Sequence, residues 1–339
     1  MAEPFAPRSM KRRNISTRPV LSPKVIPQDE EIPEPEIGRE YQLDLISADL
    51  QLIQELGSGD GAAVSKVKNL ATGVLIARKV FRSQPNEELR ERALRELERL
   101  HDCHSDWLVR FYGACFDESS NVVMCMEYMD VGSLDKVSKL CGSIRVDVIG
   151  KIAEAILGGL TYLYVNHRIL HQDVKPSNIF VNSKGHFKLS DFGIPREFIS
   201  PVSDAVPGET SPYMAPERIL GESATVKSDV WSFGISLLEL ATGIPPFHLD
   251  AEQRDVDDAL AGPLDLARRI VHGPAPRLPK SDAFPLILED LVEKCLCKVS
   301  EERPTPQELF VRLLSRASPA LFIDSANMKL GWGSFPSSF

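Results

Sequence analysis

The sequence predicts an α+β fold in which a mainly β first part is followed by a mainly α second part. Short alternating apolar runs between Leu52 and Met129 indicate strands. After a connector at residues 129–133, apolar residues recur at helical spacing instead. These residues are Ile149, Ile152, Ile156, Leu160 and Leu163. With 339 residues, of which 43% are hydrophobic, the chain is long enough to bury a core in both parts.

A glycine-rich segment at residues 57–62 separates the first two expected strands. Its glycines let backbone N–H groups approach phosphates, although a glycine-rich hairpin turn explains the pattern equally well. Lys79 lies on the strand behind this segment, and an inward-facing lysine needs an anionic partner. A helix is predicted next from the spacing of Leu89, Ala93, Leu97 and Leu100. Glu96 on this helix is the natural partner of Lys79, although it also fits an ordinary exposed helix position.

Two further apolar runs, residues 107–116 and 121–129, indicate paired strands before the connector. In the second part, a loop with several prolines follows Gly193. Helical patterns come after this loop, around residues 228–242, 258–271, 284–297 and 305–316.

The stretch of residues 169–193 carries most of the polar side chains that suggest chemistry. It contains Asp173, Lys175, Asn178 and Asp191, with apolar residues between them that suit two hairpin strands. Such a set is typical of phosphoryl transfer: one carboxylate aligns a hydroxyl, the lysine neutralises a phosphate oxygen, and the amide and the second carboxylate hold magnesium. The spacing His-x-Asp-x-x-x-x-Asn followed by Asp-Phe-Gly is highly specific.

Composition narrows the kinds of partner. Lysine and arginine number 39 against 48 aspartates and glutamates, and the formal net charge of −9 argues against a general nucleic-acid or anionic-membrane surface. We therefore expect a protein partner and no nucleic acid. No apolar run approaches the roughly 20 residues that a membrane span needs, and the first residues lack the apolar core of a signal peptide.

The six cysteines form no Cys-x-x-Cys pair, and most lie in apolar runs, where a buried free thiol is expected. This pattern favours a reducing, intracellular compartment. We expect a cytoplasmic location, with the nucleus as a second one.

Both ends of the chain have a composition that differs from the rest. Residues 1–45 are rich in proline and charge and have little to bury, so we expect a disordered tail. A basic cluster at residues 11–13, followed by Val20 and Leu21, suits docking to an acidic groove beside an apolar pocket; a solvated tail is the alternative. Residues 317–339 are expected to form a poorly ordered tail with a few apolar anchors.

Taken together, these motifs resemble the eukaryotic protein kinase superfamily across residues 50–316. Within it, several segments look like those of a mitogen-activated protein (MAP) kinase kinase: residues 77–79, 125–130, 132–135, 174–178 and 213–218. Residues 4–14 are similar to filamentous-fungal members that act in pheromone and filamentation cascades.

This resemblance implies a bilobal protein kinase fold, with an N-lobe at residues 50–128 and a C-lobe at residues 132–316. It also implies ATP and Mg²⁺ in the cleft between the lobes. The partners that it implies are a downstream MAP kinase, phosphorylated on a threonine and a tyrosine, and an upstream MAP kinase kinase kinase or a scaffold. Docking of the downstream kinase would use the basic cluster at residues 11–13, although Val20 and Leu21 are adjacent here rather than spaced apart.

The resemblance also assigns nucleotide-binding roles. Lys79, paired with Glu96, would hold the α- and β-phosphates. Met126 would be the gatekeeper beside the adenine, and the backbone of Glu127 and Met129 would bind the adenine. The glycines that would cover the phosphates are Gly57, Gly59 and Gly61, and the other residues of the nucleotide site would be Leu56, Val64, Ala77, Ser177 and Phe180.

By the same match, Asp173 would orient the substrate hydroxyl, supported by Thr210, and Lys175 would neutralise the γ-phosphate. Asn178 and Asp191 would bind magnesium. Two further features would be structural, namely Asp229 and the pair of Glu217 with Arg303.

The chain departs from the family pattern in ways that bear on control. Where the family has an arginine that binds the phosphate added to the activation segment, this chain has Gln172, which carries no charge. Counting from either end of the segment places Pro201 and Ala205, or Val202 and Val206, at the usual phosphorylation sites, while Ser200 and Ser203 have the wrong spacing. We therefore expect activity that does not depend on ordinary upstream phosphorylation. The alternative is a weak or inactive pseudokinase that serves as a scaffold.

A second departure is Ser190, directly before Asp191. Many family members carry a cysteine there, which some fungal resorcylic acid lactones alkylate by Michael addition. A serine hydroxyl is a poor nucleophile toward such acceptors. Ser190 therefore indicates either neutral drift or an inhibitor-tolerant accessory copy of the enzyme.

Overall fold

A computed structural model describes residues 50–59, 62–81, 97, 100–117, 119, 121–193, 210–247 and 263–316. Contacts divide the chain into two units, Met1–Tyr41 and Gln42–Phe339, and every described residue belongs to the second. Several sequence predictions lie outside the described residues: the two tails, Gly61, Glu96 and the positions of the activation segment from 194 to 209.

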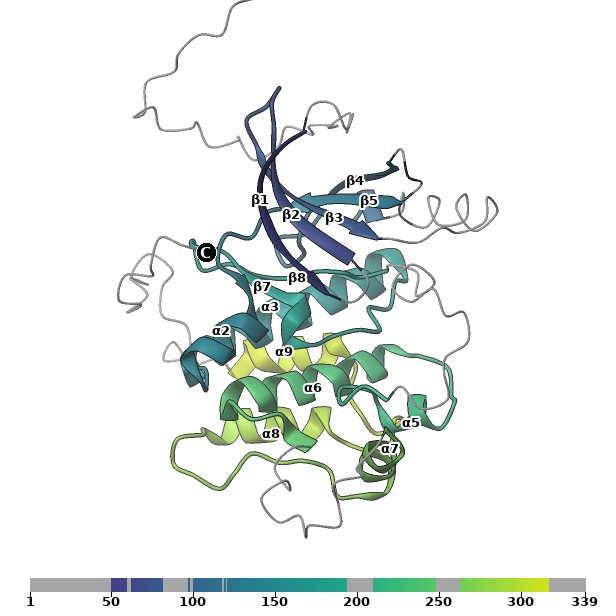
Figure 1. Ribbon diagram of the computed structural model, residues 1–339. Helices are drawn as coiled ribbons and strands as arrows, with labels where there is room; N and C mark the ends of the chain where they lie inside the picture. The colour runs from purple at the N-terminus through teal and green to yellow at the C-terminus, as the bar shows by residue number, and fades with distance from the viewer. Residues whose placement is uncertain are drawn as a thin grey trace, which may run out of the picture. The chain divides into compact units, whose positions relative to one another are not determined.

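The first part is a five-stranded antiparallel sheet with the order β1-β2-β3-β5-β4 (Figure 1). Its strands are β1 (Leu50–Gly59), β2 (Ala62–Asn69), β3 (Leu75–Phe81), β4 (Phe111–Phe116) and β5 (Val122–Glu127). The turn between β2 and β3 is built by Asn69, whose side-chain oxygen accepts the backbone N–H groups of Ala71 and Thr72 at 3.0 and 2.9 Å. Gly73 completes this turn with φ = +74°, a conformation that favours glycine.

Strand alternation sorts side chains onto the two faces of this sheet. Ile76 of β3 packs on one face, in a small cluster with Val67, Val123 and Cys125. Phe81 faces the other way and belongs to the main core. Because Lys79 and Phe81 are two residues apart in β3, Lys79 shares the face of Phe81.

The second part combines a small sheet with helices. The sheet has the order β6-β7-β8, formed by β6 (Gly132–Ser133), β7 (Ile179–Val181) and β8 (Phe187–Leu189). The helices are α2 (Leu134–Cys141), α3 (Val146–His167), the 3-10 helix η2 (Pro176–Asn178), α5 (Pro216–Ile219), α6 (Val226–Thr242), α7 (Pro263–His272), α8 (Leu286–Cys295) and α9 (Pro306–Arg316). The α+β class predicted from the sequence is confirmed.

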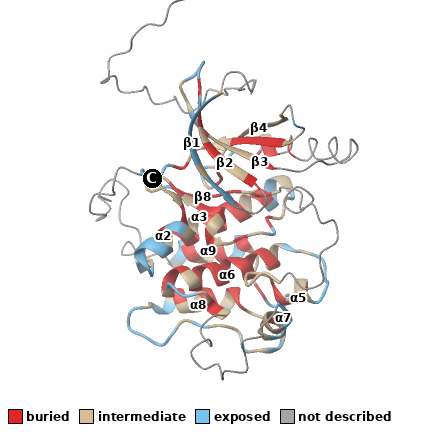
Figure 2. Cartoon of the chain, viewed as in Figure 1, coloured by how far each residue is buried: buried red, intermediate tan, exposed pale blue. Residues whose placement is uncertain are grey.

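Helix α6 lies at the centre of the helical core, in contact with α3, α8 and α9 (Figure 2). Thr225 caps its N-terminus and forms a reciprocal capping box with Ser228, and Gly243 ends it with φ = +73°. Most of its residues are buried on all sides, which is the pattern of a core helix rather than an amphipathic surface helix. A side chain at Gly234 has no room, because its Cβ would lie 2.5 Å from Cys295 Cβ.

Helix α3 is the one helix among the described residues that is long and apolar enough to cross a membrane. It is instead largely buried inside the protein, where it packs against β8, α6 and α9. Gly158 allows this close packing, since a Cβ there would come 2.6 Å from the ring of Trp107. The fold therefore accounts for the apolar character of α3 without a membrane.

Candidate active site

A buried carboxylate holds the backbone conformation of the residues directly before Asp173. Asp229, in the first turn of α6, accepts the backbone N–H groups of His171 at 2.9 Å and Gln172 at 2.7 Å. These bonds hold Gln172 at φ = +65°, which a non-glycine residue rarely adopts. Burial raises the pKa of Asp229, while the charge and hydrogen bonds of His171 oppose that rise. Asp229 thus fixes the backbone directly before Asp173.

Asp173, Lys175 and Asn178 come together in one short loop. Lys175 Nζ lies 3.0 Å from Asp173 Oδ2, and the Asn178 side-chain N–H donates to both the carboxylate and the carbonyl oxygen of Asp173, at 2.9 and 2.8 Å. The Asp173 side chain is 42% exposed, so it is open to a substrate while its orientation is held by Asn178. The three residues predicted to act together are therefore neighbours in space.

Asp191, two residues after β8, meets Lys79 from the five-stranded sheet. Lys79 Nζ lies 2.9 Å from Asp191 Oδ2, and both side chains are largely buried. The other carboxylate oxygen, Oδ1, is buried and has no hydrogen-bond partner among the residues that the structure describes. A buried carboxylate oxygen without a partner is costly, unless a cation binds it when the site is in use.

This orphaned oxygen fits a magnesium ion. Asn178 offers a second oxygen, because its side-chain nitrogen is used by Asp173 and no hydrogen bond to its side-chain oxygen is recorded among the described residues. Mg²⁺ prefers oxygen ligands and commonly takes only one or two from the protein, the rest coming from water and phosphate. The described residues contain no group of three or more histidines, cysteines, aspartates and glutamates that could hold a metal. Asp191 and Asn178 would thus hold Mg²⁺ together with a bound nucleotide.

Strand register places the expected nucleotide-site residues next to one another. Val64 pairs with both Gly57 and Lys79, and Ala77 pairs with Met126. Gly57 has φ = +134°, so a side chain there would be strained. Glu127 ends β5, and Met129 begins the connector as a buried residue. The remaining positions lie on named elements: Leu56 and Gly59 on β1, Ser177 on η2 and Phe180 on β7.

Comparison with known proteins accounts for this arrangement. The family model of the protein kinase domain matches residues 50–312. The MAP kinase kinase MST7 of Pyricularia oryzae is 55% identical over 323 residues, which cover 92% of this chain and 78% of MST7. The dual specificity protein kinase FUZ7 of Mycosarcoma maydis is 41% identical over 81% of this chain and 73% of FUZ7. A serine/threonine-protein kinase STE7 homologue of Candida albicans is 43% identical over 63% of this chain and 37% of that protein. The chain belongs to the MAP kinase kinase family of protein kinases.

In this kinase, Ser190 lines a small pocket. Its hydroxyl donates to the Asn178 carbonyl oxygen at 3.2 Å, and the residue is 2% exposed. The pocket is lined by Leu100, Val109, Phe111, Met124, Met126, Ser190, Asp191 and Phe192. Residue 190 therefore borders a space that Met126, the expected gatekeeper, and Asp191 also line.

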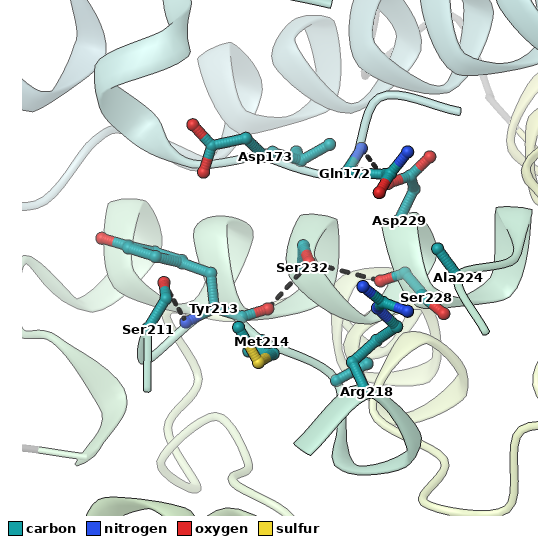
Figure 3. A pocket seen from close by; sticks show the side chains of 12 residues that line it. Gln172, Asp173, Ser211, Tyr213, Met214, Arg218, Ala224, Ser228, Asp229 and Ser232 are labelled. Atoms are coloured by element: carbon teal, nitrogen blue, oxygen red, sulfur yellow. Dashed lines mark hydrogen bonds between the residues drawn. The ribbon is translucent and has the colours of Figure 1, made fainter. Parts of the chain in front are cut away.

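A second pocket of the kinase lies beside Asp173 (Figure 3). Tyr213 borders it, and its hydroxyl donates to Glu239 Oε2 at 2.6 Å, while Ser232 donates to the Tyr213 carbonyl oxygen at 2.7 Å. Burial and the neighbouring Glu239 raise the pKa of Tyr213, so its hydroxyl stays protonated. Thr210 lies three residues before Tyr213. Among the described residues, no hydrogen bond joins Thr210 to Asp173, so the predicted role of Thr210 in supporting Asp173 stays a prediction.

Glu217 and Arg303 form a buried ion pair with two contacts, of 2.7 and 3.1 Å. Arg303 is fully buried and also donates to the carbonyl oxygens of Cys297 and Lys227. Burial raises the pKa of Glu217, but the hydrogen bonds and charge of Arg303 outweigh it, so the pKa lies below its usual value. The pair joins the end of the activation segment to the residues before α9.

Two parts of this site were missed by sequence reasoning. One is the hydrogen bond from Tyr213 to Glu239, 26 residues apart. The other is Lys188, whose ammonium contacts both carboxylate oxygens of Glu127 at 2.9 and 2.8 Å, 61 residues away. A polar residue flanked by buried Phe187 and Leu189 on a short strand was the only available signal for Lys188.

Proposed function

We propose that this kinase transfers the γ-phosphate of ATP to a threonine and a tyrosine of a downstream MAP kinase. The observation that carries this proposal is Oδ1 of Asp191, a buried oxygen without a hydrogen-bond partner among the described residues; Asp191 directly follows Ser190, whose backbone N–H donates to the carbonyl oxygen of Asn178 in the Asp173 loop. The printed names of MST7 and FUZ7 support the MAP kinase kinase class and dual specificity. An upstream MAP kinase kinase kinase or a scaffold is the second kind of partner that the family implies.

The transfer can be written from the residues present. Asp173 accepts a hydrogen bond from the substrate hydroxyl and takes its proton as the hydroxyl oxygen bonds to the γ-phosphorus. The bond from this phosphorus to the oxygen bridging it to the β-phosphate breaks, and ADP leaves. Lys175, 3.0 Å from Asp173, stabilises the charge of the transferred phosphoryl group. Mg²⁺ held by Asn178 and Asp191 would neutralise the phosphate oxygens.

Dual specificity is tested with a MAP kinase that is itself inactivated, so that it cannot phosphorylate its own residues. Incubation with this kinase and Mg-ATP, followed by peptide mass spectrometry, is expected to show phosphate on both a threonine and a tyrosine. Phosphate on serine or threonine alone would show that dual specificity is wrong, while protein kinase activity would still be supported.

We also propose that activity does not require phosphorylation by an upstream kinase. Gln172 supports this, because it is exposed beside the Asp173 loop and has no charge with which to bind a phosphate. The candidate phosphorylation positions lie outside the described residues, so this support comes from Gln172 and the sequence of the segment. Replacement of Gln172 by arginine is not expected to raise the activity of the unphosphorylated enzyme.

For Ser190 we propose tolerance toward Michael acceptors that occupy the ATP site. The support is its position on the pocket next to the gatekeeper Met126, where a thiol would be within reach of a bound inhibitor. Ser190→Cys is expected to create time-dependent inactivation by such an acceptor, while Ser190→Ala stays insensitive. If Ser190→Cys is as insensitive as the wild type, this proposal is wrong.

A further inference from the structure

The connector between the two parts of the molecule is tied by side chains to the β7–β8 hairpin. The tightest tie joins Glu127, the last residue of β5, to Lys188 of β8, with both carboxylate oxygens within 2.9 Å of the ammonium. The side chains are 22% and 14% exposed, so this ion pair is shielded more than a surface pair. Three residues further along the connector, Asp130 Oδ1 accepts the backbone N–H of Ser183 at 2.8 Å.

Backbone bonds hold Glu127 itself in place. The Arg110 N–H donates to Glu127 Oε2 at 3.1 Å, and the Glu127 N–H donates to the Arg110 carbonyl oxygen at 2.8 Å. The carboxylate therefore has one fixed donor on the sheet side and one charged donor on β8. Its orientation depends on the ammonium, because Lys188 is its only charged contact recorded among the described residues.

Strand β8 leads directly to the metal-binding end of the site. Leu189, next to Lys188, donates to the Trp107 carbonyl oxygen at 2.8 Å and accepts the Val109 N–H at 2.9 Å. Two residues after Leu189 comes Asp191. A shift of β8 along the connector would therefore change the separation between Asp191 and the backbone of Glu127 and Met129.

From this arrangement we infer that Lys188 and Glu127 form a positioning pair for ATP, which sets the distance between the adenine end and the magnesium end of the nucleotide site. The inference rests on the proposed function, because it takes the connector backbone as the adenine contact and Asp191 as the magnesium ligand. The pair touches neither the reacting atoms nor the protein substrate. Its loss weakens ATP binding selectively, since only the nucleotide spans both ends.

The test measures the affinity for Mg²⁺ with a non-hydrolysable ATP analogue by calorimetry, and the KM values for ATP and for the MAP kinase separately. Lys188→Met and Glu127→Gln are each expected to weaken nucleotide affinity by about fivefold to tenfold, and the double variant by no more than either single change, as expected for directly interacting residues. Lys188→Arg restores affinity. The KM for the MAP kinase stays unchanged in all of them.

Arg312→Met is the matched control, since it breaks a partly exposed ion pair with Asp290, of 2.8 Å, that lies on α8 and α9. It leaves nucleotide affinity unchanged. If the Lys188 and Glu127 variants bind the nucleotide as the wild type does and only melt at a lower temperature, the pair is merely structural and the inference is wrong. A wild-type protein that binds no Mg-nucleotide would overturn the proposed function along with it.

Discussion

Lys79 Nζ lies 2.9 Å from Asp191 Oδ2, although 112 residues separate the two in the sequence. The contact joins the five-stranded sheet to the segment after β8, and the other Asp191 oxygen is buried with no partner in the described part of the chain. One oxygen of Asp191 is thus neutralised by the chain itself. Under the proposed function, the second oxygen would bind Mg²⁺ when the nucleotide is bound.

Asp191→Asn is expected to abolish the magnesium dependence of nucleotide binding. An amide has one neutral oxygen and cannot replace the carboxylate as a Mg²⁺ ligand, so affinity for Mg-ATP falls at least about tenfold, or about 1.4 kcal/mol. Titration calorimetry with and without Mg²⁺ measures this. Asp265→Asn, which changes a partly exposed carboxylate of α7 that pairs with Arg269, is the control and keeps the wild-type affinity. Equal Mg-ATP binding by Asp191→Asn and the wild type contradicts the assignment.

Asp173→Asn separates catalysis from binding. Loss of the carboxylate removes the group that takes the hydroxyl proton, so kcat falls by about 10²- to 10⁴-fold. The KM for ATP is expected to change little, because Asp173 would act on the substrate hydroxyl and is not itself assigned a contact with the nucleotide or with Mg²⁺. Steady-state kinetics on a MAP kinase substrate gives both values. A kcat equal to that of the wild type would rule out a role for Asp173 in transfer.

Arg303→Met is expected to reduce stability more than activity. It leaves the buried Glu217 carboxylate without its charged partner, which costs about 3 to 5 kcal/mol of unfolding free energy. Denaturant titration followed by circular dichroism measures this loss. Arg312→Met removes a partly exposed pair and costs only about 0 to 1 kcal/mol. Similar losses of unfolding free energy in both variants would show that burial of the Glu217–Arg303 pair does not make its disruption more costly.

The same pair predicts a pH dependence of stability. The folded pKa of Glu217 lies below its ordinary value of 4.5, so its contribution is fully present above that value and is lost as the pH falls through the lower, folded pKa. The stability gap between the wild type and Glu217→Gln should therefore be constant from pH 7 to about 5 and shrink in more acid solution. If the stability difference between the wild type and Glu217→Gln instead grows as the pH falls, the pKa of Glu217 is raised by folding and the assigned direction is wrong.

The sequence predicted that Lys79 lies on a strand and needs an anionic partner, but it could not identify every partner. Sequence reasoning paired Lys79 with Glu96, which lies outside the described residues, so that pairing stays a prediction; the contact with Asp191 was not foreseen. Alternation fixes the direction of a side chain within a strand, whereas its partner depends on which distant loop folds over that face. The pairing of Lys188 with Glu127 was missed for the same reason.

The predicted ends of strands and helices were accurate where local contacts determine them and less accurate where distant contacts do. The apolar run of residues 107–116 was predicted as one strand, but β4 begins only at Phe111, because Leu108 forms a parallel bridge with Leu189 of β8 instead. The apolar pattern of residues 107–116 is the same whether a residue pairs with β5 or with β8, so the pattern alone does not give the start of β4. By contrast, the helices predicted around residues 228–242 and 305–316 match α6 and α9 closely, since their spacing and capping residues are local.

The most direct measurement is phosphate transfer from ATP to a MAP kinase by protein produced in bacteria, with no upstream kinase present. The wild type is expected to phosphorylate the MAP kinase under these conditions, while Lys79→Met and Asp173→Asn give only background. Transfer that begins only after treatment with an upstream kinase contradicts the independence from phosphorylation inferred from Gln172. If all three proteins give the same background signal, with or without that treatment, the protein has no kinase activity toward the MAP kinase, and a scaffold role is favoured.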